Sequence, residues 1–468
     1  MPSRYLKGSL MIFEQHYLEC LSQASYFIGD ETTGQAVVVD PRRDVASYLE
    51  SAEQHGMKIM YVLETHFHAD FLSGHLELAA ATGAKIGYGS KADTEFDAAK
   101  FDHGDRIVLG DVVLEIRHTP GHTPESVSIV IYESADAAPY GVLTGDTLFI
   151  GDVGRPDLLS SKGMTSNELA GMLYDSLHGQ LLSLPDDTLV YPGHGAGSSC
   201  GKNLSSETSS TIGAQRSTNY ALADMSKEAF VEVVTAGQTA PPNYFAHDAA
   251  LNRELRPLLD HTLMPETLSL ADALAAQETG AVVLDTRGPE DFATGHLAKS
   301  VNIGMAGRYA EFAGGVLDPN TPIVLVAEPG QELEAKNRLG RIGFDNVIGS
   351  LDSPIDAIRN NPQVATQASR LDIDGLGHAM DTVEGLQLVD VRQPGETDGG
   401  VIAGAQLIPL TRLVERLETL DRSKPTVIYC AGGYRSSIAA SVLVANGFGD
   451  VSDVLGGYGA WDAAMATA

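Results

Sequence analysis

Six histidine and aspartate side chains follow short strand-like segments in the first half of the chain, and this arrangement limits the folds open to it. The first three stand in the run Thr-His-Phe-His-Ala-Asp-Phe at residues 65–71, directly after the apolar segment 59–64. Loops that follow strands gather at one edge of a sheet, where imidazole and carboxylate groups can share a metal ion. One such histidine alone is ordinarily a hydrogen-bonded core or surface residue, but six at four strand ends predict a metal site. They are His66, His68, Asp70, His122, Asp146 and His194.

The segments around these residues predict a sheet covered by helices. Short runs rich in Val and Ile between glycine-rich turns indicate strands, and apolar residues at helical spacing indicate the helices between them. The expected strands are 36–40, 59–64, 107–116, 127–132, 141–143 and 188–191, and the expected helices are 45–55, 74–81 and 166–176.

The second half of the chain contains an internal repeat. Residues 282–287 read Val-Val-Leu-Asp-Thr-Arg, residues 388–392 read Leu-Val-Asp-Val-Arg, and a further apolar strand follows each, at 323–327 and 426–429. Strands that alternate with helices indicate a parallel sheet, here in a unit of about 100 residues that occurs twice. With turn signals at Pro241-Pro242 and Pro362, we expect three domains, 1–254, 255–362 and 363–468.

The charge and the cysteine content indicate which partners and which cellular compartment to expect. Asp and Glu number 62 against 31 Lys and Arg, and this formal net charge of -31 disfavours nucleic acid and membrane surfaces as partners. Three cysteines in 468 residues are too few for a disulfide framework and indicate a reducing compartment. The apolar run at residues 10–13 is shorter than a signal peptide or a spanning helix requires. A cytoplasmic protein is expected.

The histidine motif resembles the signature of the metallo-β-lactamase superfamily, His-x-His-x-Asp-His followed by distant His, Asp and His. The resemblance covers about residues 10–250 and implies an αββα sandwich. The sixth motif position, a ligand of the second metal in that superfamily, is Phe71 here. Because a benzyl group cannot coordinate, a binuclear hydrolytic site such as that of glyoxalase II loses a ligand.

The fuller motif at residues 65–74, Thr-His-x-His-Ala-Asp-Phe-x-Ser-Gly, resembles a bacterial form of the persulfide dioxygenase branch. That resemblance implies one Fe(II) per chain, held by His66, His122 and Asp146. It leaves His68, Asp70 and His194 as outer groups that orient the ligands and handle protons. Two imidazoles and one carboxylate form the triad of Fe(II) oxygenases, which leaves coordination positions for O₂ and substrate.

Three further residues of the first half, Arg155, Cys200 and Cys20, are candidates for the site or the core. Arg155 matches the family's substrate-binding arginine by its spacing from Asp146, with a salt bridge as the alternative. Cys200 follows His194 closely and is either a small buried side chain or a thiol near the iron pocket that can carry or sense sulfane sulfur. Cys20 is expected in the core. Gly195-Ala196-Gly197 stands where the relative acting on glutathione persulfide has a tyrosine, so glutathione is not assigned as the carrier.

The second repeat carries Cys430-Ala-Gly-Gly-Tyr-Arg435 between a buried strand and a helix. Inward-pointing N–H groups, a helix N-terminus and an arginine all favour a thiolate and can cradle a persulfide anion. The segment resembles the rhodanese active loop, Cys-x-x-Gly-x-Arg, over about residues 366–468. The resemblance implies catalytic roles for Cys430 and Arg435 and substrate binding by Gly432, Gly433 and Tyr434. The first repeat has residues 326–331, Val-Ala-Glu-Pro-Gly-Gln, instead, and is expected to be a degenerate rhodanese.

The whole chain therefore resembles bacterial fusions of a persulfide dioxygenase, a degenerate rhodanese and a rhodanese. The resemblance implies oxidation of a low-molecular-weight thiol persulfide by O₂ to sulfite and thiol, and then sulfur transfer to sulfite to give thiosulfate, in sulfide detoxification. A homo-oligomer, a dimer or tetramer, is expected. Two alternatives are a binuclear thioester hydrolase of glyoxalase II type with rhodanese appendages and a non-enzymatic sulfane-sulfur carrier or sensor.

Overall fold

A computed structural model describes residues 10–158 and 163–467. Residues 1–9, which belong to the stretch judged free of a signal peptide, lie outside the described residues. Over the described ranges, no helix is both long enough and apolar enough to cross a membrane. The chain divides into two compact units, one formed mainly by residues 1–241 and 245–260 and the other mainly by residues 261–340 and 344–468.

The first unit contains two six-stranded sheets. In the first sheet β3 to β6 run parallel, so the carboxyl ends of β3 and β4 meet at one edge. Its strands are β1 (Met11–Leu18), β2 (Gln23–Asp30), β3 (Gln35–Val39), β4 (Lys58–Leu63), β5 (Lys85–Gly89) and β6 (Ala99–Phe101). In the second sheet β10 and β11 are the parallel pair. Its strands are β7 (Arg106–Val108), β8 (Val113–His118), β9 (Val127–Tyr132), β10 (Gly141–Gly145), β11 (Leu189–Pro192) and β12 (Ser210–Thr211).

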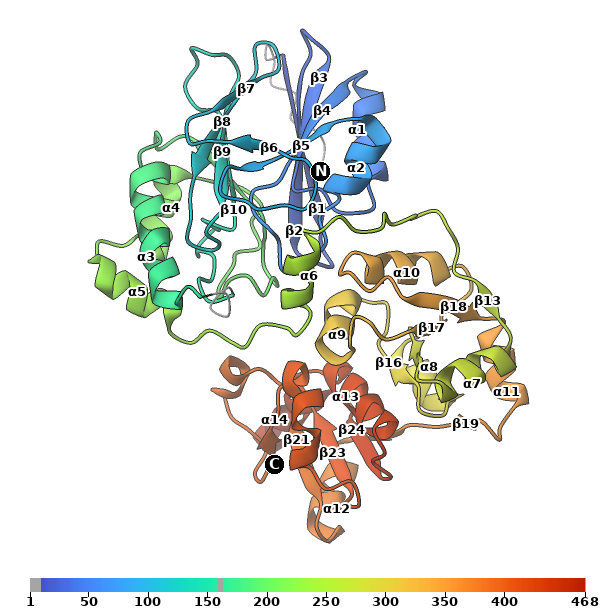
Figure 1. Cartoon of the computed structure of the whole chain (residues 1–468). Helices are drawn as coiled ribbons and strands as arrows, with labels where there is room; N and C mark the ends of the chain where they lie inside the picture. The colour runs from blue at the N-terminus through green and yellow to red at the C-terminus, as the bar shows by residue number, and fades with distance from the viewer. Residues whose placement is uncertain (1–9, 159–162, 468) are drawn as a thin grey trace. The chain divides into compact units, whose positions relative to one another are not determined.

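The two sheets pack face to face between layers of helices, as Figure 1 shows. Buried side chains of both sheets, such as Ile28 and Ile129, share one apolar core. The outer face of the first sheet packs against α1, and the outer face of the second packs against α3 and α5. This arrangement is the predicted αββα sandwich, and the fold class is confirmed. The helices are α1 (Ala46–Gln54), α2 (His75–Thr82), α3 (Ser166–Ser176), α4 (Ile212–Thr218), α5 (Lys227–Thr235) and α6 (Phe245–Leu251).

The second unit contains the predicted repeat, and its two main sheets have the same strand order. The first sheet runs β13-β18-β17-β14-β16 and the second runs β20-β24-β23-β21-β22, with parallel pairing throughout. The strands of the first are β13 (Thr267–Leu268), β14 (Val282–Asp285), β16 (Val301–Asn302), β17 (Ile323–Val326) and β18 (Val347–Leu351). Those of the second are β20 (Ser369–Leu371), β21 (Gln387–Asp390), β22 (Gln406–Leu407), β23 (Thr426–Tyr429) and β24 (Val451–Val454). A short antiparallel pair, β15 (His296–Leu297) with β19 (Ala365–Thr366), lies outside both.

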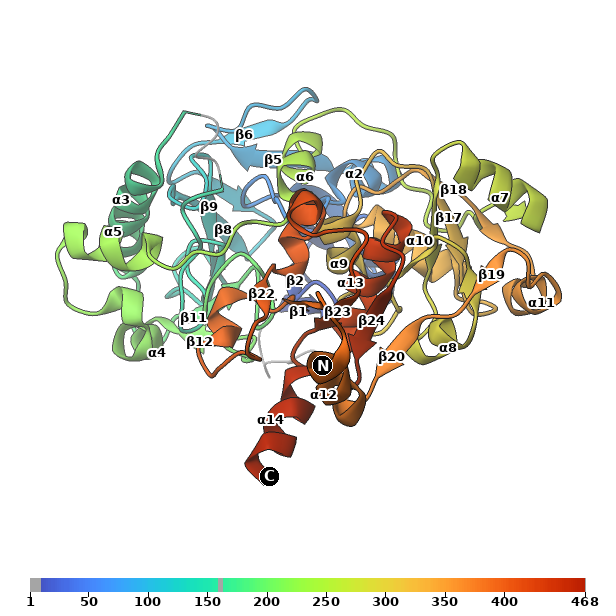
Figure 2. The same cartoon turned by 90° about the horizontal axis from the view of Figure 1, so that it is seen from below.

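Helices follow the strands in both copies. Figure 2 shows α13 beside β23 and β24. The helices of this unit are α7 (Leu270–Glu278), α8 (Pro289–Thr294), α9 (Tyr309–Val316), α10 (Glu332–Gly340), α11 (Pro354–Asn360), α12 (Ile373–Thr382), α13 (Tyr434–Ala445) and α14 (Gly457–Thr467).

Two local expectations were wrong. The run 107–116 is not one strand but the antiparallel hairpin of β7 and β8, which turns at Gly110 with φ of 145°. That backbone conformation is favourable only for glycine. Cys20 is half-buried in the turn between β1 and β2 instead of lying in the core. It precedes a buried strand, but the turn keeps its own side chain near the surface.

Candidate metal centre and cysteine loop

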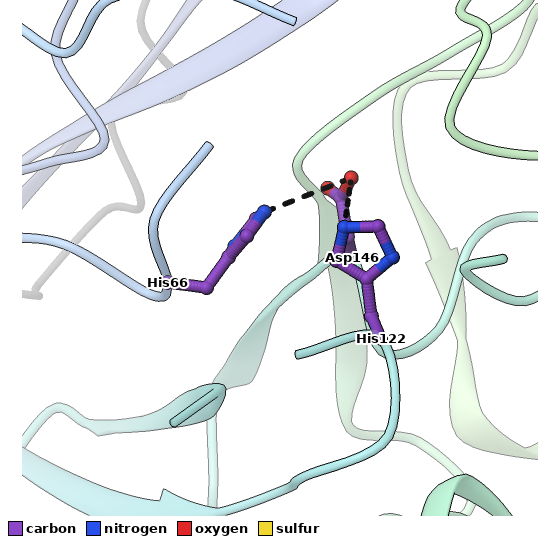
Figure 3. Close-up of side chains that lie close together, drawn as sticks. All are labelled: His66, His122 and Asp146. Carbon is purple, nitrogen blue, oxygen red and sulfur yellow. Dashed lines mark ion pairs between the residues drawn. The ribbon is translucent and has the colours of Figure 1, made fainter. Parts of the chain in front are cut away.

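Three of the predicted ligands converge in a buried group, the His66–His122–Asp146 triad. His66 lies beyond β4, His122 in the loop from β8 to β9, and Asp146 directly after β10. The Asp146 Oδ2 atom is 3.9 Å from His66 Nε2 and 3.6 Å from His122 Nε2 (Figure 3). The two imidazole rings are perpendicular to each other, and both Nε2 atoms face the same carboxylate. One ion can therefore contact all three groups.

Hydrogen bonds at the far side of each ring leave the Nε2 atoms free for a metal. His122 Nδ1 is 2.9 Å from the carbonyl oxygen of Arg155. Because a carbonyl only accepts, Nδ1 carries the hydrogen and Nε2 keeps its lone pair. His66 Nδ1 lies 3.0 Å from Thr65 Oγ1, which itself donates to Asp40 Oδ2 at 2.9 Å. The Thr65 hydroxyl is thus an acceptor toward His66.

Burial keeps the two imidazoles in the neutral state that a metal requires. It lowers the pKa of His122 to about 4 and the pKa of His66 well below its usual range, so both rings are neutral. Burial also raises the pKa of Asp146 to about 6. No N–H or O–H group of the described residues donates to either carboxylate oxygen of Asp146, and the Cys200 thiol lies beside it. A buried carboxylate without N–H or O–H donors facing two neutral imidazoles fits a bound cation.

The other three predicted residues form a second buried triad. His194 Nε2 lies 3.4 Å from Asp70 Oδ2 and 3.5 Å from Asp146 Oδ1, and His68 completes a group that could itself hold an ion. The ring of Phe71 packs against His68 at a centroid distance of 4.3 Å. His68 Nε2 lies 3.2 Å from Asp40 Oδ1, and this carboxylate outweighs burial and raises the pKa of His68. An apolar ring and a competing carboxylate make this second group a poorer metal site than the first.

Arg155 and Cys200 both border the metal centre. Arg155 is buried, and its guanidinium donates to Asp157 at 2.7 and 2.8 Å and to the carbonyl of Ser199 at 3.1 Å. Substrate binding by Arg155 stays a prediction, but in this structure the guanidinium has protein partners. The buried Cys200 thiol groups with Asp146 and His194. Burial and the charges of Asp70 and Asp146 raise the pKa of the Cys200 thiol, so it is protonated at neutral pH.

Two positioning residues were missed in the sequence. Asp40 ends a predicted strand, so the rule that selected the other strand-end acids could have found it. Its carboxylate accepts hydrogen bonds from the backbone N–H and the hydroxyl of Thr65. Asn252 donates to the carbonyl oxygens of His68 and Phe71 at 2.8 and 2.9 Å and accepts from Ser73 N at 2.9 Å. A lone asparagine so far along the chain carries no sequence signal for this role.

The cysteine loop lies in the second unit, between β23 and α13. Cys430 is buried at the end of β23, and its sulfur accepts a hydrogen bond from Gly433 N at 3.1 Å. Gly433 has φ of 100°, and Gly432 is exposed at the loop surface. The Arg435 guanidinium pairs with both oxygens of Glu396 at 2.6 Å.

Glycine at position 457 is required by a close backbone approach. Its φ is 57°, and a Cβ atom there would lie 2.3 Å from the carbonyl oxygen of Cys430. The approach lets Tyr458 N donate to that carbonyl at 2.7 Å. The start of α14 thereby holds the backbone of the loop at Cys430.

The first repeat keeps the scaffold of this loop but has no cysteine in it. Ala327 follows β17 as Cys430 follows β23, and Glu328 to Gly330 are exposed. Both copies retain the same buried ion pair, Asp285 with Arg287 and Asp390 with Arg392.

Comparison with known proteins agrees with this arrangement. A family model described as "Metallo-beta-lactamase superfamily" matches residues 18–194, and one described as "Rhodanese-like domain" matches residues 269–360 and 376–464. The fold and the histidine–aspartate centre thus define a metallo-β-lactamase superfamily protein that carries two rhodanese-like domains.

Similarity to individual proteins indicates which family of the superfamily the chain belongs to. "Persulfide dioxygenase ETHE1, mitochondrial" of Bos taurus is 30% identical over 231 residues, which are 48% of this chain and 82% of that protein. "Hydroxyacylglutathione hydrolase cytoplasmic" of Arabidopsis thaliana is 35% identical over 181 residues, 38% of this chain and 66% of that protein. A crystal structure of a metallo-β-lactamase from Staphylococcus aureus has a TM-score of 0.66 and 34% identity, and the match covers 73% of this chain and 99% of that one. The chain belongs to the persulfide dioxygenase family, in the form fused to rhodanese-like domains.

Proposed function

We propose that the chain is an Fe(II) persulfide dioxygenase joined to a sulfurtransferase. In the first reaction one low-molecular-weight persulfide, one O₂ and one water give sulfite, the free thiol and two protons. In the second, the outer sulfur of another persulfide passes to sulfite and gives thiosulfate. The observation that carries the proposal is the buried His66–His122–Asp146 triad. Phe71, which stands where the superfamily motif has a ligand of the second metal, packs against His68 in the adjoining group.

One iron would be held by this triad, and it would supply the activation of O₂. Arg155 fixes His122 through its backbone carbonyl, and Thr65 with Asp40 fixes His66. Asp70, whose pKa burial raises to about 6, and His194 are adjacent to Asp146 and are placed to take up or release protons. The buried apolar ring of Phe71 keeps a second ion from gaining a ligand.

The proposed sulfur transfer uses Cys430. Its thiolate attacks the outer sulfur of a persulfide, a new S–S bond forms to Cys430, and the carrier thiol leaves. Sulfite then attacks the terminal sulfur, thiosulfate forms, and the Cys430 thiolate is restored. The Gly433 N–H that faces the sulfur supports the anion in both states. Arg435, in the first turn of α13, interacts electrostatically with Cys430 while it pairs with Glu396.

A binuclear thioester hydrolase is the second candidate, because His68, Asp70 and His194 also lie within reach of one ion. The Arabidopsis relative named as a hydroxyacylglutathione hydrolase supports the same alternative. Metal stoichiometry separates the two functions. One iron per chain is expected for the dioxygenase, and two metal ions per chain are expected for the hydrolase.

Oxygen uptake supplies the direct test. Anaerobically purified chain should contain one iron and consume O₂ when a persulfide of glutathione, of coenzyme A or of a simple thiol is added. Binding of a persulfide without O₂ consumption would instead support a sulfane-sulfur carrier or sensor. Comparison of the three persulfides identifies the carrier, which the loop at residues 195–197 leaves open.

The remaining expectations belong to the same proposal. We propose domain limits of 1–254, 255–362 and 363–468, a cytoplasmic location consistent with three free cysteines, and a homo-oligomeric state.

A further inference from the structure

The side chain of Tyr434 leaves the cysteine loop and ends against the degenerate rhodanese domain. Its hydroxyl lies 2.6 Å from the carbonyl oxygen of Gly304 and 3.2 Å from that of Ala306. Burial raises the pKa of Tyr434 to about 12, so the phenol keeps its proton at neutral pH. Because carbonyl oxygens only accept, the phenol is the donor in this contact.

Arg338 of α10 also holds this segment, residues 304–307. The guanidinium donates to the carbonyl oxygens of Met305 and Gly307 and lies over the ring of Tyr309. Four successive carbonyls are therefore shared between two side chains, one from each rhodanese-like domain. Such complete use of backbone acceptors fixes the segment in one conformation.

Further contacts join the same two domains around Tyr434. β16 lies against α13, where Asn302 N donates to Ser441 Oγ at 2.9 Å. The ring of Phe312 in α9 packs near that of Tyr434 at a centroid distance of 5.5 Å. Figure 1 shows α9 and β16 next to α13. The contact of Tyr434 is thus part of a packed interface within the second unit.

We propose that Tyr434 is a positioning residue through which the degenerate domain holds the Cys430 loop in the conformation that accepts sulfur. Tyr434 directly follows Gly433, whose N–H donates to the Cys430 sulfur and whose φ is 100°. Because it is glycine, this residue can also adopt other conformations. Anchoring the next side chain restricts this glycine. The inference rests on the proposed sulfurtransferase function and gives the cysteine-less domain a task within it.

Tyr434→Phe in the full chain tests the inference, because it removes the hydroxyl and keeps the ring. Loss of one hydrogen bond of about 1 kcal/mol corresponds to about a 5-fold effect. With thiosulfate as the donor, we expect kcat/KM for the acceptor to fall about 5-fold, equally for cyanide and for a dithiol. Equal factors indicate loop positioning, since a residue that recognises the acceptor would discriminate between them.

Amide hydrogen exchange gives a readout that does not depend on activity. The amides of residues 431–436 should exchange about 5-fold faster in Tyr434→Phe, while those of β17 stay at the parental rate. Tyr309→Phe is the matched control, because this buried hydroxyl has no hydrogen-bond partner among the described residues. It should change neither measurement.

A second variant changes the side of this contact that belongs to the degenerate domain. Arg338→Lys loses the fork that holds Met305 and Gly307 without touching the cysteine loop. It should slow transfer in the same direction as Tyr434→Phe, and the double variant should be less impaired than the product of the two single effects. Parental transfer or parental loop exchange in Tyr434→Phe would overturn the inference. A parent chain without transferase activity would instead refute the proposed function, and the exchange data would still decide the role of Tyr434.

Discussion

Replacing Asn252 by Leu tests whether a residue distant in sequence holds the metal-binding loop. The side chain is fully buried and makes three hydrogen bonds, two to carbonyls within the motif and one from Ser73 N. Leucine has nearly the same size, so the change removes the hydrogen bonds without opening a large cavity. The groups at His68, Phe71 and Ser73 remain behind in a buried environment.

The magnitude follows from these three bonds. Each contributes about 1 kcal/mol net, and a buried group left without a partner adds to the loss, so we expect destabilisation of about 3 kcal/mol. A free energy of this size corresponds to about 100-fold faster exchange for amides that open with the loop. The metal affinity should fall about 10-fold to 100-fold, as for other changes to groups that orient ligands.

Hydrogen exchange is the suitable assay, because the single tryptophan, Trp461, lies in α14 and does not report on the first unit. Amides of residues 65–74 are compared with those of β9, and metal content is measured on the same samples. Asn346→Leu is the control, since its exposed amide makes one bond to the carbonyl of Asn320. It should change stability by less than about 0.5 kcal/mol. If Asn252→Leu alters loop exchange less than about 3-fold and keeps its metal, the reasoning from buried hydrogen bonds is refuted.

Three shorter predictions follow from the same structure. Asp146→Ala should lose both metal and O₂ uptake, because two histidines without the carboxylate bind Fe(II) weakly; full iron occupancy would exclude this ligand set. Cys430→Ser should still consume O₂ with a persulfide but release mainly sulfite, since Ala327 leaves the other copy without a thiol; thiosulfate at the parental rate, measured early and at low persulfide, would contradict it. Burial, with a smaller effect of Arg287, lowers the pKa of His296 from 6.5 to about 4. Below pH 6.5 this histidine binds a proton in the unfolded chain but stays neutral in the folded chain. The free energy of unfolding should therefore fall by about 1.4 kcal/mol for each unit by which the pH is lowered, down to about pH 4. In His296→Gln, the stability measured by exchange of the β14 amides should depend less steeply on pH. A slope equal to that of the parent chain would contradict this role of His296.

The sequence correctly predicted the features of the fold that follow from apolar spacing and from the internal repeat. Helices α1, α2 and α3 lie where apolar spacing placed them, and both rhodanese-like sheets have the parallel pairing that the repeat required. The prediction was wrong where a single glycine decided the outcome, because Gly110 turns one apolar run into a hairpin. Periodicity reports which face of a segment is buried, but it does not report a reversal of direction within the segment.

The candidate site was predictable only as far as residue types at strand ends identify it. The grouping of His66, His122 and Asp146 follows from β4, β8 and β10 ending near one another. Asn252 and the Tyr434 contact were not predictable, since both act on backbone carbonyls of remote segments. A carbonyl has the same chemistry in every residue, so no pattern of side chains marks the partner.

The use of main-chain oxygens at residues 304–307 determines which sequence changes the first rhodanese-like domain can tolerate there. Tyr434 and Arg338 bind main-chain oxygens and no side chain of this segment. Exchanges of Met305 or Ala306 that keep the backbone path therefore leave the contact intact, whereas an inserted or deleted residue shifts every carbonyl out of place. The length of the segment is constrained more strictly than its composition. The proposed support of the neighbouring loop requires only a backbone of fixed shape, so it needs no cysteine in the first copy.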